Sequence, residues 1–360
     1  MRPKDKTLRP VKSESTGIFP PPRSITRHHP TASYLSHPGL SRKAPRSSQP
    51  CLPYLRPSIR IISKSPPESI KRQEEKLEIS FCSKAGGSHT RPKAYNQDAG
   101  VGCRLEIQPA SHLLLVCDGH GDWGHNISAR IVENFPRLLK EAIDKGEGRR
   151  FDGTIGAMRD ACLGANEDLR NSGLTCRASG STCVAVLIQR NRLICANVGD
   201  SRAVLGRRTP SGCIPYPLSH DHKPDDPAER IRIEQAGGRV APESQKPYGS
   251  ARVWYVDEEG PGLAMSRALG DFDAQEIGVV DTPDITLTPR TDQDLCVVVA
   301  SDGVWQYVTD TEAVELVEQA SLQGQRAQAA ERLVELATQR WSAHESRRDD
   351  ITAVVTFLDQ

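Results

Sequence analysis

The chain has 360 residues, with 47 Lys and Arg against 46 Asp and Glu and a formal net charge of +1. This length suits one large domain with a tail, or two small domains, and the near-zero charge gives no overall field that would attract nucleic acid or an anionic membrane. No apolar run approaches the ~18 residues that a spanning helix needs, so we expect no membrane span. Because the net charge is close to zero, we also expect no nucleic-acid partner.

The ten cysteines are scattered, with no C-x-x-C pair and no Cys/His cluster at zinc spacing. Several of them, such as Cys117, Cys183 and Cys296, lie inside apolar runs, where a free cysteine behaves as a small hydrophobe. We therefore expect a reducing compartment and an intracellular protein, cytoplasmic or nuclear.

Residues 1–75 differ in composition from the rest. The first 60 are rich in Pro and Ser and contain two acids, Asp5 and Glu14. Such a segment cannot bury enough apolar surface to offset chain entropy, so we predict a disordered basic tail over 1–75 and a folded domain over 76–360. A basic, acid-poor start is also typical of targeting segments, but the run Pro20–Pro22 and the absence of an amphipathic period favour a plain tail.

Periodicity and turn residues predict the elements of the domain in chain order. We expect strands over 77–83, 101–107, 113–117, 180–188, 193–205, 295–300 and 351–358. We expect helices over 128–143, 154–171, 225–238, 311–319 and 325–341. Pro136 predicts a kink or an early end of the first helix, and Gly199 to Ser201 predict a bend between two strands in 193–205. Residues 239–262 are interpreted as a long surface loop, and the whole as an α+β fold in which sheet packs on sheet with helices outside.

The stretch 113–124 combines an apolar strand with chemistry at its carboxyl end. Asp118 ends the strand, and a rigidly held carboxylate can bridge two hard cations. His120 can exchange a proton near neutral pH, and Gly119, Gly121 and Gly124 allow a tight turn close to a ligand.

The same glycines fit the dinucleotide fingerprint G-x-G-x-x-G. That alternative needs a second strand about 20 residues on that ends in an acid. Here a helix leads into the polar segment 144–150, and Asp118 would lie beside the pyrophosphate. We therefore favour a cation site over a dinucleotide site.

Aspartate recurs at the ends of strand-like runs. Asp302 follows the run 295–300, Asp349 precedes 351–358, and Asp98 lies in the loop before 101–107. Each alone is most often a turn residue, but several carboxylates at strand ends form the oxygen-rich site that Mg²⁺ or Mn²⁺ requires. Nitrogen and thiolate ligands are absent from the set, which argues against zinc. A two-metal carboxylate site suits attack of an activated water on phosphorus.

Eight motifs occur together in one order. They are NQD at 96–98, DGHGDWG at 118–124, SGST at 179–182, NVGDSR at 197–202, RIEQAGG at 232–238, SRALGD at 266–271, SDGVW at 301–305 and RDDIT at 348–352. With these motifs the chain resembles the metal-dependent type-2C protein serine/threonine phosphatases, the PPM family. The resemblance implies a four-layer α-β-β-α sandwich, in which two mainly antiparallel sheets are flanked by helix pairs.

The resemblance also implies a site with two Mg²⁺ or Mn²⁺ ions per chain. Asp118 would bridge the ions, Gly119 would offer its carbonyl, Asp302 and Asp349 would complete the ligands, and Asp98 would lie close by. Activated water would attack the phosphorus of phosphoserine or phosphothreonine, and His120 would protonate the leaving oxygen.

The basic residues depart from the family pattern. Lys93 stands where family members often place a phosphate-binding Arg, and Arg91, two residues earlier, could substitute for it. Arg232 matches a basic residue of the family's flap, the loop beside the active site that is thought to contact substrate. Arg177 and Gln306 replace the acids of a third metal site, so we expect two ions and no third.

Two functions follow from this reading. The first is an active phosphatase, working as a monomer on phosphorylated proteins. The alternative is a catalytically weak or inactive binding module that keeps the phosphatase fold. Release of phosphate from a phosphothreonine peptide distinguishes them.

Overall fold

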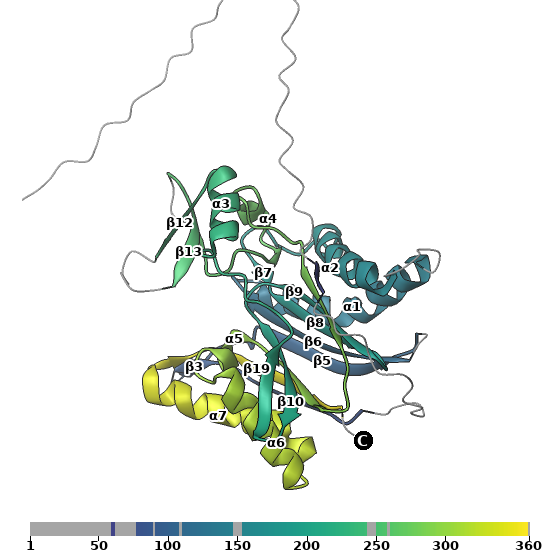
Figure 1. Cartoon of the computed structure of the whole chain (residues 1–360). Helices are drawn as coiled ribbons and strands as arrows, with labels where there is room; N and C mark the ends of the chain where they lie inside the picture. Colours follow the sequence, from purple (N-terminus) through teal and green to yellow (C-terminus); the bar gives the residue numbers. More distant parts are fainter. Residues whose placement is uncertain are drawn as a thin grey trace, which may run out of the picture. The chain divides into compact units, whose positions relative to one another are not determined.

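Two main β-sheets organise the part of the chain that the structure describes (Figure 1). This computed structural model describes residues 59–61, 77–88, 91–107, 110–146, 153–242, 250–257 and 260–358. All of them belong to the second of two units, Met1–Tyr54 and Leu55–Gln360, into which contacts divide the chain. These ranges contain seven α-helices and several mainly antiparallel sheets, so the predicted α+β class is confirmed.

The first sheet is centred on β6, the strand that carries Asp118. Its strands are β1 (Ile59–Ile61), β5 (Asp98–Leu105), β6 (Ser111–His120), β7 (Gly180–Ser181), β8 (Cys183–Ile188), β9 (Arg192–Val198), β15 (Leu269–Gly270) and β16 (Asp284–Pro289). Strand β6 is hydrogen-bonded to β5 on one side and to β8 and β7 on the other. The apolar run predicted as a buried strand is confirmed, since residues 111–117 are buried throughout.

The second sheet has five strands in the order β11-β10-β17-β19-β2. They are β2 (Ile79–Lys84), β10 (Arg202–Thr209), β11 (Gly212–Pro217), β17 (Asp294–Ala300) and β19 (Ile351–Phe357). The predicted bend at 199–201 is confirmed, and it has a consequence for the fold. It sends the chain from β9 in the first sheet to β10 in the second.

Side-chain alternation divides the core around the two main sheets into three clusters. In β6, Leu113 and Leu115 pack toward one face, while Leu114 and Val116 pack in a cluster with residues of the second sheet such as Val299. Helices α1 (Gly124–Gly146) and α2 (Gly153–Asn171) cover the first face, and α6 (Asp310–Leu322) and α7 (Ala329–His344) cover the second sheet. These contacts agree with the α+β class, and the exact four-layer arrangement stays a prediction.

Several boundaries differ from the prediction. Helix α1 runs through Pro136 to Gly146, so the predicted early end is wrong. The ring of Pro136 removes one backbone hydrogen bond, but Ile131, Phe135 and Leu139 lie on one buried face that spans the interruption. None of the described helices combines the length and apolar character needed to cross a bilayer.

The predicted surface loop at 239–262 is also wrong in part. Here β12 (Gly238–Pro242), β13 (Ala251–Tyr255) and β14 (Pro261–Leu263) form a three-stranded sheet beside α3 (Pro227–Gln235). We call α3 with β12, β13 and β14 the flap. Its apolar side, which includes Ile233, Val240 and Val253, packs in a small core, and this burial explains why glycine and proline did not prevent strands.

The remaining short elements lie near the ends of the main strands. They are β3 (Gly87–Ser88), β4 (Arg91–Pro92), α4 (Phe272–Gln275), α5 (Asp302–Trp305), η1 (Arg326–Gln328) and β18 (Arg347–Arg348). Strand β1 pairs in parallel with β16 although it falls within the predicted tail, so residues 59–61 are a correction to that prediction. The rest of 1–75 lies outside the described residues, and its predicted disorder stays a prediction.

Candidate active site

Two of the predicted ligands lie where the two sheets face each other. Asp98 and Asp118 are directly opposite in the β5–β6 ladder, so their side chains leave the sheet on the same face. Asp118 has the same alternation as Leu114 and Val116, which places it on the side of the second sheet. Ser301, which follows β17 in that sheet, donates its hydroxyl to Asp98 Oδ2 at 2.7 Å.

A cavity of about 600 Å³ opens at this point. It brings together six of the predicted site residues, Lys93, Asp118, Gly119, His120, Asp302 and Asp349. Asp98 is 8% exposed and is not among the residues that line the cavity. Gly119 is needed here because a Cβ would overlap the carbonyl oxygen of Gly124 and approach that of Gln97 to 2.6 Å.

Burial and mutual repulsion perturb these carboxylates. Burial, with smaller contributions from neighbouring carboxylates, raises the pKa of Asp98 to about 7. Burial and the charge of Asp200 raise the pKa of Asp302 to about 7, and burial together with Asp98 and Asp302 raises the pKa of Asp118 well above its usual range. Such a group of buried acids calls for positive charge.

The donor set fits a hard divalent cation in its chemistry. All the side-chain donors are oxygens, and Asp98 Oδ1 is buried without a hydrogen-bond partner among the described residues. Within those residues, however, no three Asp, Glu, His or Cys side chains already surround one point closely enough to ligate an ion together. The carboxylate of Asp349, one of the predicted ligands, is paired with Lys93 instead.

Lys93 reaches the cavity but does not point at open space. Its Nζ donates to Asp349 Oδ1 at 2.7 Å and to Asp350 Oδ2 at 3.1 Å. Burial opposes the charged form, yet the two carboxylates raise the pKa of Lys93 above its ordinary value. The backbone of Arg91 lies in β4, opposite Ser88 of β3.

His120 has a partner that the sequence analysis did not identify. Its Nε2 lies 2.5 Å from Oδ2 of Asp271, and both residues line the cavity. Burial alone would lower the pKa of His120, but the Asp271 carboxylate outweighs burial and raises it. Asp271 lies in the motif SRALGD, to which no individual role was given, and 151 positions separate it from His120.

Asp200 and Lys223 were also missed. Asp200 is buried at 1% exposure and pairs with Lys223 Nζ at 2.5 Å. Its Oδ1 has no hydrogen-bond partner among the described residues. Lys223 therefore compensates the negative charge of Asp200, and the pair adds no net charge to the acidic cluster at the bend where the chain passes between the sheets.

Arg232 takes part in the structure of the flap. It donates to both oxygens of Glu229 at 2.7 and 2.8 Å and to the carbonyl oxygens of Gly278 and Ser266, each at 2.8 Å. It does not line the cavity. This placement does not support the predicted contact with substrate, and the Glu229 carboxylate explains where the guanidinium goes instead.

Arg177 lies at the mouth of the cavity. Its side chain is 76% exposed, and its Nε donates to Asp273 Oδ1 at 2.8 Å. The guanidinium is thus at the surface and paired, and it does not fill a buried third metal position.

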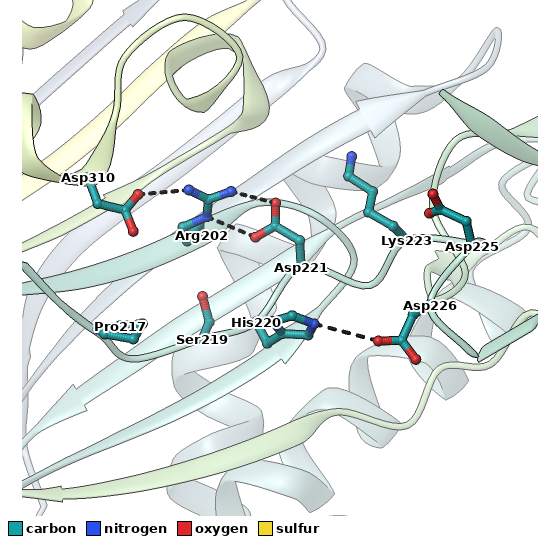
Figure 2. Close-up of a pocket in the computed structure, with 9 residues that line it drawn as sticks. All are labelled: Arg202, Pro217, Ser219, His220, Asp221, Lys223, Asp225, Asp226 and Asp310. Atoms are coloured by element: carbon teal, nitrogen blue, oxygen red, sulfur yellow. Dashed lines mark hydrogen bonds and ion pairs between the residues drawn. The ribbon is translucent and has the colours of Figure 1, made fainter. Parts of the chain in front are cut away.

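A second hollow of about 470 Å³ lies beside β10 and contains none of the predicted site residues (Figure 2). Arg202 lies between Asp221 and Asp310 there and donates to both, at 2.7 to 2.9 Å. Arg202 thereby links β10 to the first turn of α6, while the Lys223 ammonium points away from His220 and Asp226 in the view. We therefore place the chemistry in the first cavity.

Comparison with known proteins decides the family. A family model described as "Protein phosphatase 2C" matches residues 78–346. The chain belongs to the protein phosphatase 2C family. It is accordingly a phosphoprotein phosphatase, which is a class of hydrolase. Members of the family generally depend on Mg²⁺ or Mn²⁺.

Individual relatives agree with this assignment. "Probable protein phosphatase 2C 48" of Oryza sativa subsp. japonica is 38% identical over 302 residues, which are 77% of this chain and 82% of the relative. "Probable protein phosphatase 2C 64" of the same plant is 40% identical over 250 residues, 68% of this chain and 58% of the relative. The crystal structure of serine-threonine phosphatase 2C from Toxoplasma gondii has the same fold, with a TM-score of 0.67, 24% identity and coverage of 78% and 94%.

Proposed function

We propose that this protein phosphatase 2C member hydrolyses phosphoserine and phosphothreonine in proteins, with two Mg²⁺ or Mn²⁺ ions in the first cavity. The observation that carries the proposal is the meeting of Asp118, Asp302 and Asp349 with His120 around one cavity, backed by the buried Asp98. All these residues come from one chain, so we expect the monomer to be active.

The chain's own oxygens would hold the ions. Asp118 would bridge them, the Gly119 carbonyl, Asp302 and Asp349 would complete the protein ligands, and Asp98 would hold a ligating water or bind directly. The bound ions would neutralise the phosphate and supply a water of lowered pKa. This requires Asp349 to turn from Lys93 toward the cavity, where part of its surface is already exposed.

The remaining residues act on the phosphate and the leaving group. When Asp349 turns, the Lys93 ammonium loses that partner but keeps its contact with Asp350, and it then offers a positive charge to the phosphate. His120 protonates the oxygen of the leaving serine or threonine, which would otherwise depart as an unstable alkoxide. Residues 260–265, which include strand β14 of the flap, also line the cavity and would help to shield the site from bulk water.

Phosphate release from a phosphothreonine peptide tests the proposal. We expect release with Mn²⁺, loss of release with a chelator and recovery on adding Mn²⁺ back. Asp118→Ala should lower the rate by at least about 10²-fold, the scale on which a positioned charge acts. Asp168→Asn is the control, because Asp168 pairs with Arg130 between α1 and α2, outside the cavity.

Two outcomes would contradict the proposal. Near-normal turnover by Asp118→Ala in Mn²⁺ would reject the two-ion site. No release by the wild type, together with retention of the phosphopeptide on the immobilised protein, would favour the binding module instead.

A further inference from the structure

We propose that Asp271 is the positioning residue of the proton donor: it holds the His120 ring so that Nδ1 delivers the proton to the leaving oxygen. The proposal deepens the function proposed above and rests on the role of His120 given there. Three observations support it. They are the hydrogen bond between Asp271 and His120, the left-handed backbone conformation of Asp271, and the lack of a side chain at Gly180, which leaves room for the carboxylate.

The contact is short and sheltered. His120 Nε2 donates to Asp271 Oδ2 at 2.5 Å, and the two side chains are 23% and 4% exposed. A hydrogen bond to a carboxylate is stronger than one between neutral groups, and more so away from water. Asp271 also precedes α4, but its side chain makes no capping hydrogen bond to that helix. The carboxylate is thus directed at the imidazole rather than at the nearby helix end.

The backbone of Asp271 is held in an uncommon conformation. Its φ of 48° and ψ of 44° are left-handed, and it is the one non-glycine residue with positive φ in the described ranges. Such a conformation is unfavourable for a residue with a side chain and persists where the surroundings impose it, often at functional sites. Here the Asp271 N–H donates to the carbonyl of Ser179 at 2.9 Å, which fixes the turn.

Gly180 makes room for the carboxylate. A Cβ at Gly180 would overlap Oδ2 of Asp271, the same oxygen that accepts from His120. Gly180 is also the register partner of both His120 and Gly270. The end of β6 and the short strands β7 and β15 therefore bring the histidine, the glycine and the aspartate side by side.

The pairing determines which nitrogen donates. Nε2 keeps its proton in the bond to Asp271, so Nδ1 is the atom that can release one. Nδ1 has no hydrogen-bond partner among the described residues, although it is buried. An unpaired buried N–H is unfavourable, so we expect Nδ1–H to find its acceptor in the substrate.

Atoms balance in this step. The phosphorus–oxygen ester bond breaks as water oxygen bonds to phosphorus, and the leaving oxygen takes the Nδ1 proton to become the serine or threonine hydroxyl. The proton lost by the attacking water restores the imidazolium. Asp271 keeps its charge throughout and makes no bond to substrate.

Kinetics with two kinds of leaving group test the proposal. The variants are D271N, H120A and the double variant H120A/D271N, assayed with phosphothreonine peptide and with p-nitrophenyl phosphate, whose leaving group needs little protonation. We expect D271N to lower kcat for the peptide by about 10- to 100-fold, the usual effect of losing a group that orients another, with a much smaller loss for p-nitrophenyl phosphate. In the H120A background D271N should have no further effect.

A control and an independent spectrum protect the conclusion from unfolding effects. Asp294→Asn is the matched control, because Asp294 is equally buried and paired with Arg207 on the second sheet. It should leave the ratio of the two rates unchanged. In proton NMR, a strongly downfield imidazole N–H resonance should be present in the wild type and absent from H120A and D271N.

The proposal is overturned if D271N slows both substrates equally, if its effect persists in H120A, or if the downfield resonance survives in D271N. Failure of the proposed function would look different. The wild type itself would then release no phosphate from the peptide, and the positioning role would fall with it.

Discussion

At the scale of single residues, the Lys93–Asp349 pair decides how the cavity takes up cations. The ammonium lies 2.7 Å from a carboxylate that the proposed function assigns to metal binding. A divalent ion must therefore compete with a positive charge that the fold supplies itself. The pair is about one-third to one-half exposed, so solvent screens the competition and makes it modest.

We expect Lys93→Met to bind Mn²⁺ more tightly and phosphopeptide more weakly. Removing the ammonium frees Asp349, and an exposed charge of this kind is worth up to about 1 kcal/mol, or roughly fivefold in affinity. Titration calorimetry measures the ion, and KM for the phosphothreonine peptide reports the phosphate.

The exposed Lys140 of α1 provides the control, since Lys140→Met removes the same charge outside the cavity. Weaker Mn²⁺ binding by Lys93→Met than by Lys140→Met would show that Lys93 supports the ion instead of competing with it.

At the scale of elements, the flap is held by a buried group of charges. Glu229 of α3 accepts from Arg232 and from Arg267, and Ser266 donates to it at 2.5 Å. Burial raises the pKa of Glu229, but the hydrogen bonds from the two arginines outweigh burial and lower it to about 2. A pKa below its ordinary value of 4.5 means that folding favours the ionised form.

Glu229→Gln should therefore destabilise the protein in a pH-dependent way. The contribution is fully present above about pH 5 and is lost as pH falls from there toward 2, because the wild-type carboxylate then takes up its proton. At pH 7 we expect a loss of about 2–4 kcal/mol, measured by urea unfolding.

The difference between wild type and Glu229→Gln should shrink steadily between pH 5 and pH 3. A difference that stays constant over this range would mean that the carboxylate is not stabilised by its charge.

The sequence allowed us to predict which residues lie at strand ends, but not which side chains from distant parts of the chain contact each other. The apolar run 113–117 placed Asp118 at a strand end, and the repeated motif of aspartate after or before a strand placed Asp302 and Asp349 near it. Asp271 and His120 meet only because β6, β7 and β15 pair, and no local pattern encodes a contact across 151 positions. Arg232 is the opposite case, since Glu229 lies three residues earlier on the same helix and this spacing allows the pair.

At the scale of the whole molecule, the boundary between tail and domain falls earlier than the composition indicated. Strand β1 joins residues 59–61 to the edge of the first sheet beside β16. Three residues of strand are a weak signal in a Pro- and Ser-rich segment, and their position depends on the exposed edge of β16 rather than on their own sequence.

Two truncations test this boundary. Removing residues 1–54 should leave the thermal midpoint and peptide turnover unchanged, because the composition of that segment predicts no core. Removing residues 1–62 also deletes β1 and uncovers the edge of β16, and we expect a midpoint lower by about 2–4 °C. Equal midpoints for the two truncations would show that β1 adds nothing to the sheet, and a large drop with the first would show that residues 1–54 pack on the domain.

The account as a whole depends on two cations between the sheets, and anomalous scattering from crystals grown with Mn²⁺ locates them directly. We predict two peaks within coordination distance of Asp118, with Asp302 and Asp349 on either side, Lys93 turned away from Asp349, and no third peak beside Arg177. Crystals of Asp118→Asn in the same solution should lose at least one of the two peaks, since an amide no longer bridges two positive ions. An unmodified protein that shows no peak in the cavity, or peaks that remain unchanged in Asp118→Asn, would contradict the account.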